Sequence, residues 1–533
     1  MKLNTVIMTN DYGGNEFDHQ WILQFYRNNY SVILVIILLI GSLLRLIPII
    51  MLGLPTDIPY NGGGLYYAFS MTIQDNYFRY PLIIPYYSTY GIPFAYNPLV
   101  FYIIALLATI TTISPFIFHI YLPTIFSILT IFAFWFFVRE TLKNDDLVIT
   151  STFFYCILPQ AFSELLPGEG LIESFGTLLF IVGIISLFRI YKRNSTKYRI
   201  VAGVLFGFLI LGSPGGALAF GLSILIIPFF NEDRISAIKT VLIISLIGIA
   251  VSIPWWSTVI AHHGINTILN GVLVKHSSFL HYFVKGFSFN VGCEWIFGPL
   301  LCLLGIIYCI VKDRWLIPVW FIPIFLAGEI GYIAPILASI LMAVGLLKII
   351  IPSLNSVRPE NNKINMIIIF FIILIFIHGI GNAVNYNTKF HWTNIPVSYK
   401  ELRENEVTSL EGIIEIKDEI NHSSRIFILG DYDLWWAGDW LPVLIKSPVI
   451  NVRYGLEWTD NFTKVNEMEK EIIGKLEYGD IEGSKKIANE YGTTITHIFA
   501  IKTINTNNVI NVLRNNEYVN VSYENEKVVF FNL

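Results

Sequence analysis

The chain has 533 residues, of which 54% are hydrophobic, 15% aromatic and only 14% charged, whereas soluble globular proteins carry about 25% charged residues. Most of the chain is therefore expected to lie in lipid. Its formal net charge of −4 provides no overall basic field, so bulk electrostatics give no reason to expect nucleic acid as a partner.

The first apolar run, at about 31–52, begins after about 30 mostly polar residues. It is too long for the core of a signal peptide and no cleavage pattern follows it, so we expect it to remain as a membrane anchor. Further apolar runs of spanning or nearly spanning length indicate helices. They lie at about 98–113, 117–138, 147–164, 171–190, 200–213, 216–230, 240–260, 293–311, 315–328, 332–350 and 364–384.

Basic connectors predict which loops face the cytoplasm, because cytoplasmic loops carry an excess of Lys and Arg. The most basic segment is Arg189–Arg199. The others are Arg139 with Lys143, Arg234 with Lys239, Lys312 with Arg314, and Arg358 with Lys363. Alternation from Arg189–Arg199 places 261–292, 329–331 and everything after about 385 outside the cytoplasm.

The run at 98–113 breaks this alternation if the loop 53–97 is external. It is short and begins at Tyr96-Asn97-Pro98, features that favour a re-entrant or interfacial helix. That count gives about eleven spans with the N-terminus inside. The alternative makes 98–113 a full span and places 139–146 outside, so the predicted fold is a polytopic α-helical membrane protein with about 11–13 transmembrane helices.

From Asn385 onward charged residues become frequent, and short β-rich runs alternate with helical stretches. The β-rich runs include Arg425–Leu429, Thr496–Ile501 and Lys527–Phe531, and the helical stretches include 462–475 and 507–514. We therefore predict two domains, a transmembrane domain at 1–384 with its first external loop at 53–97, and an extracytoplasmic α/β domain at 385–533. The second has no cysteine, so we expect its own core to hold it together, helped by Trp435, Trp436, Trp440 and Trp458.

The first external loop is long and dense in proline and tyrosine, as functional loops at a membrane surface often are. An anchor ending in Leu44-Arg45-Leu46 precedes a loop with an acid and a Tyr66-Tyr67 pair, and the motif Gly91-x-Pro-x-x-Tyr-x-Pro-Leu-x-x-Tyr102 follows. This order resembles the GT-C superfamily of membrane glycosyltransferases, most closely members related to protein mannosyltransferases and lipid A aminoarabinose transferases. The resemblance covers the first 110 residues best, then the hydropathy plan, and more faintly the last domain with Tyr454–Trp458.

The resemblance implies transfer of a sugar from a polyprenyl-phosphate donor to an external glycan, lipid or protein, with an acidic residue of the first loop as base or as the group that orients the acceptor. It also implies inversion at the sugar. This chain departs from the family where the acid is expected, because Asn61-Gly-Gly-Gly64 occupies that place. Asp57 and Asp75 are the alternative catalytic acids, and Asp57 ranks first because it follows the anchor closely. Tyr60, Asn61, Tyr66 and Tyr96 are the candidate sugar-binding residues of the loop.

Two further groups are candidate ligands. Glu169 and Glu173 stand four residues apart, so they share a helix face and fit either substrate or divalent-metal binding, or simply a helix N-terminus favoured by its dipole. In the loop 261–292, Lys275, His276 and Lys285 form a candidate clamp for the donor phosphate. Arg45 is expected to extend to the membrane surface or to join that clamp.

The predicted function is a glycosyltransferase of the plasma membrane with its last domain outside. Two alternatives stay open. One is a transporter or flippase of lipid-linked glycan. The other is a catalytically inactive GT-C relative that binds surface glycan or partner proteins, an alternative that the substitution at Asn61–Gly64 supports.

Overall fold

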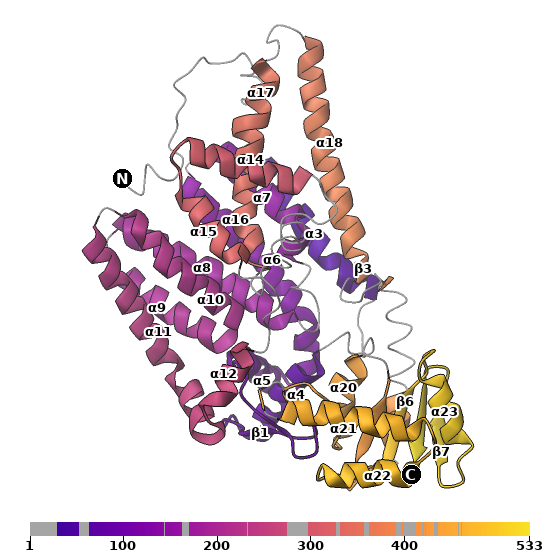
Figure 1. Ribbon diagram of the computed structural model, residues 1–533. Coiled ribbons are helices and arrows are strands. Elements are labelled where there is room, and N and C mark those ends of the chain that lie inside the picture. Colours follow the sequence, from indigo (N-terminus) through magenta and orange to yellow (C-terminus); the bar gives the residue numbers. More distant parts are fainter. Residues whose placement is uncertain are drawn as a thin grey trace.

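The computed structural model separates a helical bundle from a smaller α/β domain, which lies at one end of the bundle and beside it (Figure 1). The structure describes residues 29–52, 63–142, 144–162, 170–193, 195–231, 233–273, 297–326, 331–356, 362–390, 397–398, 412–417, 420–421, 423–430, 435–456, 458–459 and 461–533. The first part of the chain forms α3 (Tyr30–Leu52), α4 (Gly64–Asp75), β1 (Ile83–Ile84), β2 (Ile92–Pro93), α5 (Leu99–Thr111), α6 (Pro115–Leu142), α7 (Asp145–Ile157) and the 3₁₀ turn η1 (Pro159–Ala161).

The bundle continues with α8 (Leu171–Arg193), α9 (Thr196–Gly212), α10 (Pro214–Ile226), η3 (Ile227–Phe230), α11 (Arg234–His263), α12 (Ile265–Leu273), α14 (Phe297–Val311), α15 (Leu316–Leu326), α16 (Ala334–Gly345), the π-helical turn η4 (Leu346–Ile350), α17 (Ile351–Ser356) and α18 (Asn362–Asn387). Within the described residues, five helices are long and apolar enough to cross a membrane, and shorter apolar helices accompany them. The five are Tyr30–Met51, Pro115–Leu142, Leu171–Arg193, Arg234–His263 and Ala334–Ser353.

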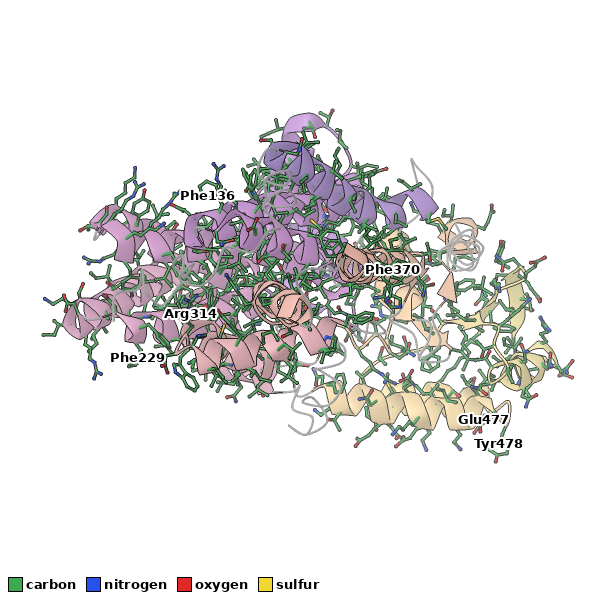
Figure 2. All side chains as sticks on the ribbon, turned by 90° about the horizontal axis from the view of Figure 1, so that it is seen from above. Phe136, Phe229, Arg314, Phe370, Glu477 and Tyr478 are labelled. Carbon is green, nitrogen blue, oxygen red and sulfur yellow. The ribbon has the colours of Figure 1, made fainter. Side chains whose placement is uncertain are left out.

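The surface of the bundle is itself apolar. Phe136 exposes 40% of its surface, Phe229 80% and Phe370 65%, and Figure 2 shows Phe136 and Phe229 at the outer face of the bundle. Exposed apolar side chains in such number mark a membrane-facing surface. The protein is therefore a multi-pass membrane protein, as the sequence predicts.

Helix α5 does not cross the bundle. Its 13 residues extend about 20 Å, which is less than the ~30 Å of a bilayer core. Arg45, near the end of α3, contacts carbonyls in the last turn of α7, and α6 and α7 are antiparallel neighbours joined by a tight turn. The end of α3 and the start of α6 therefore lie at the same end of the bundle, which supports the re-entrant or interfacial alternative for 98–113.

We call this end the domain end, because the α/β domain packs there. Leu171, Ile172 and Phe175 in the first turns of α8 share one hydrophobic cluster with residues of the first loop and of the α/β domain. The basic segment that begins at Arg189 lies toward the other end of α8, 18 residues after Leu171 and so about 27 Å away. The two segments predicted to face opposite sides of the membrane thus lie at opposite ends of the bundle.

The last part of the chain contributes β3 (Lys389–Phe390), β4 (Val397–Ser398), β5 (Ile426–Leu429), α20 (Trp435–Ile445), α21 (Asn461–Leu476), α22 (Ile481–Glu490), β6 (His497–Ile501), α23 (Asn507–Arg514), β7 (Asn520–Glu524) and β8 (Val528–Asn532). Its main sheet has the order β5-β6-β8-β7, with β5 parallel to β6 and the other pairs antiparallel. Three predicted β-rich runs become β5, β6 and β8, and the predicted helical stretches become α21 and α23.

The two faces of this sheet belong to different cores, because successive side chains of a strand point in opposite directions. Phe427, Ile498 and Phe531 face a core made within the α/β domain with α21, α22 and α23. Ile426, Phe499 and Phe530 face the cluster shared with the first loop. The expectation that this domain holds itself by its own core alone is therefore wrong, since the first loop supplies the cover for one face of its sheet.

Candidate functional site

The N-terminus of α4 is the point at which the first loop meets the α/β domain. The carboxylate of Asp439, in α20, accepts hydrogen bonds from the backbone N–H groups of Gly63, Gly64 and Leu65, at 2.5, 2.7 and 2.7 Å. The first N–H groups of a helix have no partner within the helix. A residue more than 370 positions later in the chain therefore caps α4.

Asp439 is 2% exposed, and its surroundings have two opposite effects on its pKa. Burial disfavours the charged carboxylate and raises the pKa to about 6, against the three backbone N–H groups, which lower it. On the same residue, the backbone carbonyl accepts a hydrogen bond of 2.6 Å from the Tyr87 hydroxyl. Side chain and main chain of Asp439 thus both bind the first loop.

The glycines at the start of α4 have a structural explanation. Gly63 has φ +116°, a conformation that favours glycine. A Cβ on Gly64 would lie 2.6 Å from the carbonyl carbon of Asp439 and 2.9 Å from the Cα of Trp440. Gly63 therefore allows the turn into α4, and Gly64 allows α4 to pack closely against α20. Both lie where the GT-C pattern is expected to have an acid.

A second connection is a backbone ladder between the loop and the sheet. The N–H of Ser88 donates to the carbonyl of Val449 and the N–H of Val449 donates to the carbonyl of Tyr86, at 3.1 and 3.0 Å. Val449 in turn bridges to Ile426 of β5. The first loop thus joins the edge of the sheet through two isolated parallel bridges, a short form of β-augmentation.

Aromatic side chains fill the space between these two connections. Tyr66 and Tyr96, both predicted to bind sugar, have ring centroids 5.7 Å apart, and the ring of Tyr96 lies 4.4 Å from that of Trp458. Tyr67 lies 5.8 Å from Trp440. Trp440 and Trp458 therefore pack against the first loop, rather than within the domain's own core as predicted; the side chains of Trp435 and Trp436 lie outside the described residues.

Asp75 lies at the other end of α4. It is exposed, and the 12 residues of α4 place it about 16 Å from the capped N-terminus. Asp75 is therefore solvated and far from the point where Asp439 binds.

The N-termini of α8 and α10 lie close together, and Glu173 is half-buried in the first turn of α8. The Ser213 hydroxyl accepts from Gly216 N–H at the start of α10 and lies 3.4 Å from the hydroxyl of Tyr332, just before α16. Gly176 of α8 packs so closely on Ser213 that a Cβ has no room. Because helix N-termini carry partial positive charge, this corner of the domain end suits an anion.

Arg45 lies inside the helical bundle and not at the membrane surface. Its side chain is fully buried and donates to Ser127 Oγ at 3.1 Å and to the carbonyls of Gly41 and Cys156 at 3.0 and 3.3 Å. Its guanidinium also lies 4.8 Å from the ring centroid of Phe162. Extension to the membrane surface is therefore wrong, because Arg45 joins α3, α6 and α7 inside the bundle.

Most of the other predicted site residues lie outside the described part of the chain. These are Asp57, Tyr60, Asn61, Glu169, Lys275, His276 and Lys285. Within the described part, no three His, Cys, Asp or Glu side chains gather in a way that would hold a metal ion.

Sequence reasoning missed Asp439, although a signal was present. It is the single charged residue in the apolar stretch Trp435–Ile445. A charged residue in such a stretch is buried only with compensating partners, and a run of glycines is one place where backbone N–H groups are accessible as donors.

No family model and no curated protein matches the sequence. Solved structures match the fold. The Archaeoglobus fulgidus oligosaccharyltransferase in complex with zinc and sulfate gives a TM-score of 0.59 at 14% identity, over 88% of this chain and 68% of that one. AglB of the same organism, in complex with an inhibitory peptide and a dolichol-phosphate, gives 0.58 at 14% identity, over 90% and 70%. ArnT from Cupriavidus metallidurans, bound to undecaprenyl phosphate, gives 0.52 at 10% identity, over 94% and 98%.

The chain has the GT-C fold. The predicted resemblance to this superfamily is thereby confirmed at the level of the fold, and the match to ArnT covers nearly the whole of both chains. In this fold, α4 and α5 form the first loop between the end of α3 and the start of α6, and the α/β domain packs against that loop.

Proposed function

We propose that this GT-C protein is a membrane glycosyltransferase that moves a sugar from a polyprenyl-phosphate donor to a hydroxyl or amide of an acceptor outside the cytoplasm. The observation that carries the proposal is the extent of the GT-C likeness, which includes proteins solved with dolichol-phosphate and with undecaprenyl phosphate. The acceptor class is an external glycan, lipid or protein.

The donor phosphate needs fixed positive charge at the membrane surface. We assign this role to Lys275 and Lys285, with His276 beside them. The partial positive charge where α8 and α10 begin supports a phosphate at the same end of the bundle.

The reaction needs a base at the acceptor. In our proposal the Asp57 carboxylate takes the proton from the attacking group, whose heteroatom forms a bond to the anomeric carbon. The bond from that carbon to the phosphate oxygen breaks, and polyprenyl phosphate leaves with the electron pair. Asp75 is the second choice, because its exposed position lies far from the capped end of α4.

Sugar and cation sites complete the proposal. Tyr60, Asn61, Tyr66 and Tyr96 would contact the sugar, and the packing of Tyr66 against Tyr96 provides a rigid aromatic surface for that contact. Glu169 and Glu173 would bind substrate or a divalent cation that neutralises the leaving phosphate.

Replacement of Asp57 by Asn tests the base. Positioned acid–base catalysis contributes typically about 10² to 10⁴ in rate, so Asp57→Asn should lose that factor while undecaprenyl phosphate still binds. Asp75→Asn is the matched control and should keep most of the activity. Full transfer by the Asp57→Asn variant would remove Asp57 from the mechanism.

Replacement of Lys275 or Lys285 by Ala tests the clamp. Either change should weaken binding of undecaprenyl phosphate, whereas Lys312→Ala, an exposed cation in the turn between α14 and α15, should not. Equal binding by all three variants would show that the clamp lies elsewhere.

The rival functions give different results in the same membranes. A flippase moves fluorescent undecaprenyl phosphate between leaflets without forming a glycosidic bond. An inactive relative binds surface glycan and forms no product with any donor in a panel of radiolabelled polyprenyl-phosphate sugars.

A further inference from the structure

We infer that Asp439 is a positioning residue for transfer: it fixes the N-terminus of α4 against α20, and with it Tyr66 in the first turn of α4, which the proposed function assigns to the sugar. This inference rests on the proposed function. It concerns a residue of the α/β domain, 375 positions along the chain from the helix that it caps.

The first step is that Asp439 holds the backbone itself. Its Oδ2 accepts from Gly63 and Gly64 and its Oδ1 accepts from Leu65, so both oxygens are engaged. A carboxylate at a helix N-terminus also gains from the helix dipole. Such contacts fix the direction of the chain at Gly63 more tightly than side-chain packing would.

The second step is that other contacts keep Asp439 in place. The Tyr87 hydroxyl binds the carbonyl of Asp439, and Trp440, the next residue, packs on Tyr67 and Phe116 with ring centroids 5.8 Å away in each case. The carboxylate is thus fixed from both sides of α20. Precise placement of a supporting group is what positioned catalysis requires.

The third step is the place of Tyr66 on the capped helix. Tyr66 follows Leu65, whose N–H binds Asp439, and its ring centroid lies 5.7 Å from that of Tyr96 and 5.4 Å from that of Phe101. A displacement of the N-terminus of α4 therefore displaces Tyr66 as well, and with it the proposed contact to the sugar. Asp439 does not take the base's role itself, since it is buried and both of its oxygens accept from α4.

The experiment compares Asp439→Asn and Asp439→Ala with Asp480→Asn. Asp480 is the matched control, because it also caps a helix, α22, through the N–H of Gly483, but that helix does not belong to the first loop. Asn keeps one acceptor oxygen and Ala keeps none, so the two variants form a graded series. The full-length protein is assayed in proteoliposomes with the polyprenyl-phosphate sugar that the wild type turns over.

We expect kcat to fall about 100-fold in Asp439→Ala, since misplacement of catalytic groups by about 1 Å costs on the order of 10² in rate. Asp439→Asn should fall between Ala and the wild type, and Asp480→Asn should match the wild type. KM for the donor should stay constant, because the proposed phosphate clamp belongs to other segments. A purely structural role would instead lower the amount of folded protein and leave kcat per folded molecule unchanged.

A disulfide provides a second readout that is independent of activity. The hydroxyl oxygens of Thr89 in the first loop and Thr493 in the α/β domain are 2.8 Å apart, so the pair Thr89→Cys and Thr493→Cys should cross-link on oxidation. In the Asp439→Ala background the cross-link should form more slowly and, once formed, should restore part of kcat.

The outcomes separate the two proposals. Transfer at the wild-type rate by Asp439→Ala overturns the positioning role and leaves the proposed function standing. A wild type that transfers no sugar from any donor, yet forms the cross-link rapidly, overturns the proposed function and with it the positioning role, while the contact between loop and domain stands.

Discussion

Substitution of Gly64 by Ala should loosen the first loop from the α/β domain. The new Cβ would lie 2.6 Å from the carbonyl carbon of Asp439, whereas carbon atoms ordinarily stay about 3.5 Å apart. Helix α20 therefore has to retreat by roughly 1 Å. The bonds of 2.5 to 2.7 Å to Asp439 then stretch beyond the ~3.2 Å limit of a good hydrogen bond.

The expected cost combines three terms. Overpacking costs about 1–3 kcal/mol, and each hydrogen bond to a charged group contributes about 1.5–3 kcal/mol, of which we expect only part to be lost. Ala favours the helix over Gly by about 0.5–1 kcal/mol. The net destabilisation of the contact is therefore about 2–4 kcal/mol, or roughly a 30- to 1,000-fold increase in opening at about 1.36 kcal/mol per factor of ten.

Hydrogen–deuterium exchange of the α4 peptide in the full-length protein measures this opening. The matched control is Gly474→Ala in α21, where no atom lies within 4 Å of the new Cβ, so this helix should instead gain about 0.5–1 kcal/mol. If α4 exchanges at the same rate in Gly64→Ala and in the wild type, the close contact with α20 does not hold the loop, and the reasoning fails.

Three further outcomes are expected. An impermeant thiol reagent applied to intact cells should label a cysteine at exposed Tyr478 and not one at Ser195, and the reverse pattern would invert the predicted topology. Burial raises the pKa of Asp439 from its ordinary value of 3.8 to about 6. Protonated Asp439 should therefore add about 3 kcal/mol to the free energy of unfolding below about pH 4, and this stabilisation should be lost as the pH rises through 6. Thermal melts of Asp439→Asn should lack this pH dependence, and an unchanged profile would contradict the expectation. Arg45→Lys should lower the melting temperature, since one ammonium cannot replace a guanidinium that binds several acceptors, while binding of undecaprenyl phosphate should not change; a selective loss of that binding would return Arg45 to the phosphate clamp.

The helices and the strands could be predicted from the sequence because each follows a local pattern. Apolar runs of spanning length led to the bundle, and β5, β6 and β8 appeared as β-rich runs. The shortness of 98–113 and its proline were enough to raise the interfacial alternative that α5 supports. Local patterns of this kind need no knowledge of distant neighbours.

The contact between the loop and the α/β domain could not be predicted in this way. The lone charge at Asp439 and the glycines near Gly64 are each visible in the sequence, but no local pattern pairs the two. The alternation of Phe427 and Ile426 on β5 likewise does not say which partner covers each face. The family pattern alone interprets these glycines as the loss of an acid. Their packing role depends on a helix that lies far along the chain.

The cap on α4 also has a consequence for biosynthesis. Gly64 emerges from the ribosome 375 residues before Asp439, which at about 5–20 residues per second corresponds to roughly 20–75 s. Throughout that interval the amides of α4 lack the acceptor that they have in the finished protein, and the uncovered aromatic surface of the loop is open to chaperones and proteases. A chain truncated before α20 would never form this contact. Synthesis of the α/β domain therefore decides whether the first loop is protected from proteases.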